Sequence, residues 1–195
     1  MNVRSIPILA GAVAAVGVFA VVLMKPYVPT PAQLAPEETA LLAEWSKVGD
    51  ALAVQRMLEQ GACVEAVSPD GTTALMSASS AGHVDVVRLL LAHNAKVNAA
   101  NNQGETALHF AVRDNQVEVV NILLEQGAKV DAASASAVTP LMIAAWSGFE
   151  VLVERLLQAG ADAELVDDDN AKAATYAREL QDEATREKIL KLLGA

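Results

Sequence analysis

Few side chains in this sequence have the type and spacing that catalysis or metal binding requires. The chain has three histidines, His83, His93 and His109, and a single cysteine, Cys63. None of them falls in a His-Glu-x-x-His or Cys-x-x-Cys spacing, and the sequence has no glycine-rich phosphate loop. We therefore expect His83 and His109 to be structural. His93 is expected near the end of a helix, where a partly charged imidazole suits the helix dipole. Cys63 has no obvious base nearby and is expected to be a buried or inert thiol.

The acidic run at 167–170 (Asp-Asp-Asp-Asn) suggests a calcium loop at first sight. It lacks the twelve-residue ligand spacing and the closing glutamate of such loops, so we interpret it as a solvated acidic loop. No other residues form a recognisable acid–base arrangement. The sequence therefore predicts a protein that is not an enzyme, with no cofactor, no metal ion and no small-molecule substrate.

The composition of the 195-residue chain limits the classes of fold and partner. Hydrophobic residues make up 53% of the sequence and aromatic residues 4%. This is too apolar for a disordered chain and too poor in aromatics for a typical β-sandwich. A single cysteine rules out an intramolecular disulfide. The net charge of −10 leaves no basic surface of the kind that binds nucleic acid, so no nucleic-acid partner is expected.

The amino-terminal part differs from the rest of the chain in charge and hydropathy. All 24 acidic residues lie at or after Glu37. Two of the 14 basic residues, Arg4 and Lys25, precede Glu37, so residues 37–195 carry a formal charge of −12. Residues 6–24 (IPILAGAVAAVGVFAVVLM) are uncharged and long enough, at about 1.5 Å per residue, to cross roughly 30 Å of hydrocarbon. The sequence predicts a transmembrane signal anchor here. A cleaved signal peptide and a buried helix of a soluble protein are the alternatives.

The charges on either side of this run predict its orientation. Arg4 and the α-amino group lie in a short flank of residues 1–5, against Lys25 alone on the other side. By the positive-inside rule, the chain is then a single-pass membrane protein with a cytoplasmic amino terminus and a periplasmic or otherwise exoplasmic domain. Residues 25–38 hold four of the seven prolines, which favours an extended spacer between the anchor and that domain.

The rest of the chain contains an internal repeat with a period of 33 residues. Three similar segments begin with a threonine at this spacing: Thr73-Ala74-Leu75-Met76, Thr106-Ala107-Leu108-His109 and Thr139-Pro140-Leu141-Met142. Each is followed by a longer apolar pattern, at 84–91, 117–124 and 151–157. The pattern favours two helices in each unit, the first capped by its threonine and the second with a Leu/Val stripe that packs against neighbouring units.

This repeat resembles the ankyrin family, whose units run close to Gly-x-Thr-Pro-Leu-His-x-Ala-Ala, then Val-Val-x-Leu-Leu-Leu, then Gly-Ala-Asp-Val-Asn. The resemblance covers about 40–195. It implies an all-α fold, an α-solenoid of about five 33-residue helix-turn-helix units in a domain at 39–195, after the one transmembrane helix. The terminal units are atypical and more polar, as capping units are. The units are placed near 40–69, 70–102, 103–135, 136–168 and 169–195.

The sequence departs from the family pattern at a few positions. Met76 and Met142 stand where the family has a histidine, which His109 retains. Asn94 replaces the glycine after the second helix, where we expect a left-handed backbone at some cost in free energy. Ala137 replaces the loop glycine of the fourth unit.

The resemblance also implies where the domain binds, because ankyrin-type solenoids bind other proteins through their loop tips and first-helix face. The corresponding residues here are Lys47, Pro69, Asp70, Ser80, Gln103, Glu105, Arg113, Asp114, Trp146 and Ser147. Trp146 is expected to be an exposed aromatic beside Arg113, and so a binding hot spot. In the alternative, it folds over the next unit and caps the stack. Trp45 takes an alanine-like core place in the first unit and is expected to close the amino-terminal end.

These features together predict a membrane-tethered protein–protein interaction module. The acidity of the domain favours a partner with a basic face, and an envelope enzyme that is stabilised or inhibited is one such partner. Two alternatives stay open. One is a structural or assembly subunit with no separate ligand. The other is a secreted, soluble repeat protein, if residues 6–24 are cleaved.

Overall fold

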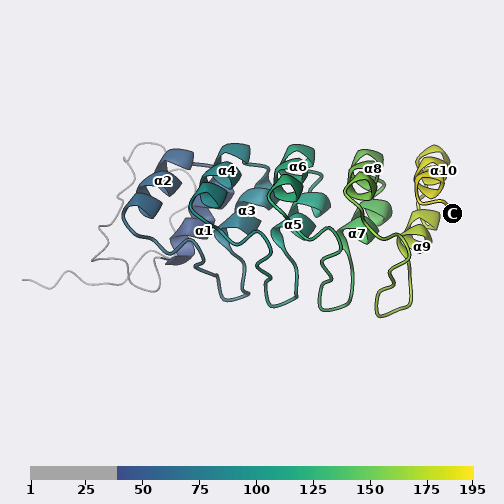
Figure 1. Ribbon diagram of the computed structural model, residues 1–195, viewed down its shortest axis with the longest axis horizontal. Coiled ribbons are helices and arrows are strands. Elements are labelled where there is room, and N and C mark those ends of the chain that lie inside the picture. The colour runs from purple at the N-terminus through teal and green to yellow at the C-terminus, as the bar shows by residue number, and fades with distance from the viewer. Residues whose placement is uncertain (1–38) are drawn as a thin grey trace, which may run out of the picture.

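The structure, a computed structural model, describes residues 39–195. These residues form ten α-helices and no β-strand, with isolated bridges between Val67 and Thr73 and between Ala100 and Thr106. The odd-numbered helices lie in one row and the even-numbered helices in a second row (Figure 1), so each consecutive pair is one unit of a solenoid, as predicted. The helices are α1 (Thr39–Val48), α2 (Ala51–Glu59), α3 (Ala74–Ala81), α4 (Val84–Ala92), α5 (Ala107–Arg113), α6 (Val117–Glu125), α7 (Pro140–Ser147), α8 (Glu150–Gln158), α9 (Ala173–Arg178) and α10 (Glu183–Leu192).

The predicted flank (1–5), signal anchor (6–24) and proline-rich spacer (25–38) lie outside the described residues. Within residues 39–195, no helix has the length and apolar character needed to cross a membrane. The two longest of these helices, α1 and α10, have ten residues each, whereas a membrane-spanning helix needs about 20.

Reciprocal caps fix where the first helix of the second and fourth units begins. The hydroxyl of Thr73 accepts a hydrogen bond from the N–H of Met76 at 3.2 Å, and the sulfur of Met76 accepts one from the N–H of Thr73 at 3.4 Å. Thr139 and Met142 repeat this arrangement one repeat further on, at 3.4 Å for both bonds. These bonds satisfy amide groups that a helix start would otherwise leave free. The predicted threonine caps are thus confirmed in these two units.

A left-handed residue ends the second helix of each central unit. Gly127 has a φ of +83° and Gly160 a φ of +91°. Asn94 has a φ of +64° at the equivalent position, which confirms the expectation from the sequence. Asparagine tolerates this conformation better than most side chains because its short polar group bonds locally.

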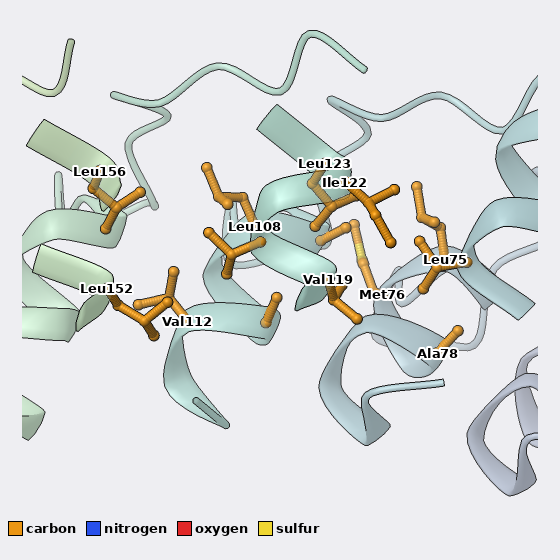
Figure 2. Packing of buried hydrophobic residues seen from close by; sticks show 14 of the residues in the cluster. Leu75, Met76, Ala78, Leu108, Val112, Val119, Ile122, Leu123, Leu152 and Leu156 are labelled. Atoms are coloured by element: carbon orange, nitrogen blue, oxygen red, sulfur yellow. The ribbon is translucent and has the colours of Figure 1, made fainter. Parts of the chain in front are cut away.

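The hydrophobic core runs continuously from unit to unit. Figure 2 shows Leu75 and Met76 of the second unit, Leu108 and Leu123 of the third and Leu156 of the fourth within it, all nearly inaccessible to solvent. The first helices approach closely because each presents a fully buried alanine, at Ala78, Ala111 and Ala144. At the equivalent place in the first unit, Trp45 is half-buried and packs against the core.

The loops between units form a ladder of turns that repeats every 33 residues. In each tip, the N–H of the fourth residue donates to the carbonyl of the first, for example Gly104 to Asn101 at 2.9 Å and Ala137 to Ser134 at 2.9 Å. Neighbouring tips are also bonded to each other. The tip-to-tip bonds run from Asn102 N to Asp70 O (3.0 Å), from Ala135 N to Gln103 O (2.7 Å) and from Asp168 N to Ser136 O (3.3 Å). The tips are therefore held in register by backbone bonds.

Gly104 allows the closest of these approaches. Its φ is +74°, and a Cβ atom added there would lie 2.8 Å from the backbone nitrogen of Ala135. We expect Gly104→Ala to lower the free energy of unfolding by about 2–3 kcal/mol, because the strained backbone costs about 1 kcal/mol or more and the displaced tip loses a hydrogen bond worth about 1 kcal/mol. Urea unfolding followed by circular dichroism measures the loss.

Gly127→Ala is the matched control, because Gly127 has a φ of +83° but open space around its Cβ position. We expect a loss of about 1 kcal/mol from backbone strain alone. Equal losses for the two variants would show that the tip contact contributes nothing.

Candidate functional site

Residues one repeat apart occupy equivalent places on successive first helices. The series 47, 80, 113, 146 and 179 therefore forms one row on or directly after α1, α3, α5, α7 and α9. Its members are the half-buried Ser80 and the exposed Lys47, Arg113, Trp146 and Glu179. The loop tips project on the same side as this row of helices (Figure 1). Side chains from the row and from the tips can thus meet in a shared groove.

Such a groove, of about 420 Å³, lies between the third and fourth units. It brings together four of the predicted binding residues: Gln103, Glu105, Arg113 and Trp146. Trp146 is 62% exposed and forms one side of the groove. The remaining lining comes from α5, the loop between the third and fourth units, and α7: His109, Ser134, Ala135, Ser136, Val138 and Ile143.

Arg113 is held in place by its neighbours within the groove. Its guanidinium forms an ion pair with the carboxylate of Glu105 and lies 5.4 Å from the ring centroid of Phe110. The amide of Asn101 also donates to Glu105, at 3.1 Å. Burial acts to raise the pKa of Glu105, but the hydrogen bonds from Arg113 and Asn101 outweigh it and hold that pKa below its usual range. The charged wall is therefore preorganised.

Ser80 and Asp114 form a separate pair beside the groove. The hydroxyl of Ser80 donates to the Asp114 carboxylate at 2.5 Å, and the side-chain amide of Gln116 donates to the Ser80 carbonyl at 3.2 Å. These bonds tie α3 to the following unit. Ser147, the remaining prediction from the fourth unit, is half-buried and does not line the groove.

The predicted residues of the first two units lie away from the groove. Lys47, Pro69 and Asp70 are exposed but line no part of it. Asp70 accepts hydrogen bonds from the hydroxyls of Ser68 (2.5 Å) and Thr72 (2.7 Å). These bonds lower the pKa of Asp70 to about 2, so this loop tip keeps its negative charge at any physiological pH.

A second, apolar slot of about 180 Å³ lies on the other side of Trp146. Its lining includes Ile143 and Tyr176, neither of which was predicted as a site residue. The repeat itself held the signal, because Phe110, Ile143 and Tyr176 are spaced by 33 and follow one another on α5, α7 and α9. The other lining residues are Val138 and Met142.

The interpretation of 167–170 as a solvated acidic loop is wrong for Asp167, although residues 168–170 are exposed. This residue is 7% exposed, and its carboxylate accepts hydrogen bonds from the N–H groups of Asp169 (3.0 Å) and Ala171 (2.9 Å) and from the hydroxyl of Tyr176. The bond from Tyr176 leads in lowering the pKa of Asp167. The same bond raises the pKa of Tyr176 to about 12. Asp167 is therefore a structural carboxylate that fixes the turn and the Tyr176 ring.

His109 is structural, as predicted. It is fully buried, its Nδ1 accepts a hydrogen bond from the N–H of Thr106 at 3.1 Å, and its Nε2 lies 3.2 Å from the carbonyl of Val138. An amide needs an acceptor and a carbonyl needs a donor, so the ring is the neutral tautomer with its proton on Nε2. Burial lowers the pKa of His109, and the arrangement agrees, because an added proton at Nδ1 would face a donor.

Because the pKa of His109 is lowered in the folded chain, the free energy of unfolding should fall as the pH falls. We expect His109→Met to reduce this loss. Below the unfolded-state pKa of about 6.5, the unfolded chain binds a proton that the folded chain refuses, so each further pH unit costs up to about 1.4 kcal/mol of unfolding free energy. Methionine already occupies the equivalent position in the second and fourth units, at Met76 and Met142. We expect a smaller loss of stability between pH 7.5 and pH 5.5 in His109→Met, measured by urea unfolding. An unchanged loss would assign the acid sensitivity to other groups.

Cys63 is exposed in the turn after α2, so of the two expected alternatives, a buried or an inert thiol, the buried thiol is wrong. The turn carries it outward because the buried positions of this segment are taken by Leu58 and Ala66. In the part of the chain that the structure describes, no three His, Cys, Asp or Glu side chains converge as metal ligands would.

Comparison with protein-family models matches two stretches of the chain. The model described as "Ankyrin repeats (3 copies)" matches residues 41–134, and the model described as "Ankyrin repeat" matches residues 138–168. A comparison with curated proteins gave no significant match. The matched stretches include every residue that lines the 420 Å³ groove except Ala135 and Ser136.

Proposed function

Since this chain belongs to the ankyrin-repeat family, whose repeats are protein–protein interaction modules, we propose that it is a membrane-tethered module that binds a protein partner through the Trp146 groove. The observation that carries the proposal is the groove itself. It combines a largely exposed tryptophan, a fixed ion pair and backbone-bonded loop tips in one concave surface. Exposed aromatic and arginine side chains in such surfaces carry much of the affinity of protein interfaces.

The charge of the domain supports a partner with a basic face. Residues 37–195 carry 12 more acidic than basic residues, and opposite charge on the partner speeds association and suppresses wrong partners. We propose that this partner is another protein of the cell envelope, such as an enzyme that the module stabilises or inhibits.

The proposed tether is the uncharged run at 6–24, with the spacer at 25–38 between it and the repeats. In this proposal the amino terminus is cytoplasmic and the groove faces the periplasm or another exoplasmic space. Reporter fusions at Ala195 test the orientation: we expect a reporter that works only outside the cytoplasm to be active, in the membrane fraction. Activity of the opposite reporter would place the groove and its partner in the cytoplasm, and loss from the membrane fraction would indicate cleavage.

Site-specific photocrosslinking tests the groove. A p-benzoylphenylalanine placed at position 146 is expected to form an adduct with the partner in living cells. The matched control places the same group at Glu154, which is exposed on α8 and lines no part of the groove. Equal adducts at both positions, or none at 146, would contradict the groove assignment. An adduct between two copies of the chain would favour an assembly subunit instead.

A further inference from the structure

The apolar slot between the fourth and fifth units carries an inference that rests on the proposed function and specifies its partner. Two aromatic side chains, Trp146 and Tyr176, and the aliphatic side chains of Val138 and Ile143 line this slot of about 180 Å³. The Tyr176 hydroxyl donates to the buried carboxylate of Asp167. Tyr176 therefore presents its ring in a fixed position, and Trp146 is 62% exposed and available to a ligand.

Two carboxylates, Asp169 and Glu179, stand close to this slot. The N–H of Glu179 donates to the carbonyl of Tyr176 at 3.1 Å. The N–H of Asp169 donates at 3.0 Å to the Asp167 carboxylate that the Tyr176 hydroxyl also binds, and both Asp169 and Glu179 are exposed. Among residues 39–195, neither carboxylate takes part in an ion pair. Arg113 of the groove and Lys172 of the loop are already engaged, because Arg113 pairs with Glu105 and Lys172 pairs with Glu164. Arg178, which directly precedes Glu179, forms no ion pair within residues 39–195.

An apolar slot beside carboxylates favours one kind of side chain. A wholly apolar side chain would fill the slot but gain nothing from Asp169 and Glu179, and an acidic one would be repelled. Arginine matches both features, because its aliphatic stem buries against apolar surface while its charged head stays at the rim. The planar guanidinium also stacks on aromatic rings and is more weakly hydrated than an ammonium group.

We propose that this slot binds an arginine side chain of the basic partner. The stem lies against Val138 and Ile143, and the guanidinium stacks on the Trp146 ring and pairs with Asp169 and Glu179. The slot is thus the specificity pocket of the larger groove, and the ion pair of Arg113 with Glu105 forms the neighbouring wall.

Selection from a library of random 12-residue displayed peptides tests this proposal. The full chain is immobilised in nonionic detergent, and peptides are kept only if they bind the wild-type chain and not Trp146→Ala. We expect arginine to be enriched several-fold among them. We also expect the enrichment to disappear when the selection uses Asp169→Asn/Glu179→Gln.

The matched control is Glu118→Gln/Glu154→Gln, which removes the same number of negative charges from two exposed positions on α6 and α8. This variant should keep the arginine enrichment. In a selected peptide, replacing the arginine with the neutral isostere citrulline should weaken binding to the wild-type chain about tenfold. It should change binding to Asp169→Asn/Glu179→Gln by less than twofold.

The outcomes separate the two proposals. Peptides that depend on Trp146 but carry apolar residues or lysine in place of arginine, or that keep arginine against Asp169→Asn/Glu179→Gln, would overturn the arginine slot and leave the groove intact. A selection that yields no Trp146-dependent peptide would overturn the groove as well.

Discussion

Replacing Leu108 with alanine is expected to lower the free energy of unfolding by about 3–4 kcal/mol. Leu108 is fully buried in α5 of the central unit. Deleting a buried leucine side chain loses its transfer free energy and leaves a cavity, for a total of about 2–5 kcal/mol. The cavity at this position collapses poorly, because its walls belong to a core that is continuous between units (Figure 2). Urea or thermal unfolding of the full chain measures the loss.

Leu52→Ala is the matched control, since it makes the same chemical change at a residue that is 56% exposed on α2. We expect a loss below about 1 kcal/mol, as for most exposed substitutions. A loss at Leu108 no larger than at Leu52 would show that the central core contributes little to stability.

The neighbour-to-neighbour architecture also predicts where the Leu108 variant opens. Units of a solenoid contact only adjacent units, so stability is a sum of unit and interface contributions. The variant should therefore lose amide protection first in α5 and α6, and then in the units beside them. Native-state hydrogen exchange would detect this order. Uniform loss over residues 39–195 would instead indicate a single cooperative unit.

The repeat made most of the fold predictable from the sequence. The apolar patterns at 84–91, 117–124 and 151–157 correspond to α4, α6 and α8 with ends that differ by no more than one residue. Asn94 stands where the other central units have a glycine. Its left-handed backbone was still predictable, because a left-handed residue follows the second helix in each of these units. Each of these features depends on local sequence, which is where a strict period is informative.

The candidate site was predictable only in part, because it depends on which side chains meet across units. The first-helix row gave Arg113 and Trp146, but no local pattern shows that Arg113 pairs with Glu105 or that Ser80 bonds Asp114. Asp167 looked like a solvated acid because its partner Tyr176 lies on the next helix. Such pairings depend on the close approach of units, which composition and spacing alone do not reveal.

The largest expected effect on binding is that of Trp146→Ala. Tryptophan is among the residues most enriched at binding hot spots, and removing such a side chain costs about 2 kcal/mol or more, which is roughly a 30-fold loss of affinity. Trp146 lines both the 420 Å³ groove and the 180 Å³ slot, so the substitution removes a wall from each. Isothermal titration calorimetry with the partner recovered by crosslinking would measure the loss.

Val151→Ala is the control for the loss of exposed apolar surface. Val151 is 57% exposed on α8 but lines neither cavity beside Trp146, so its removal should leave the affinity within about twofold. Urea unfolding distinguishes the binding role of Trp146 from the capping alternative. A side chain that is 62% exposed should contribute less than about 1 kcal/mol to folding. A large loss of stability in Trp146→Ala with unchanged affinity would instead make it a cap of the stack.

Arg113 acts on binding in two ways, which Arg113→Ala alone does not separate. It can contact the partner directly, and it neutralises Glu105, whose side chain is only 17% exposed. Removing Arg113 alone leaves that carboxylate without its ion pair, whereas Arg113→Ala/Glu105→Gln removes both charges. If affinity recovers in the double variant, Arg113 serves mainly to hold Glu105. If it does not, Arg113 contacts the partner itself, and Trp146 and Arg113 together form the binding centre.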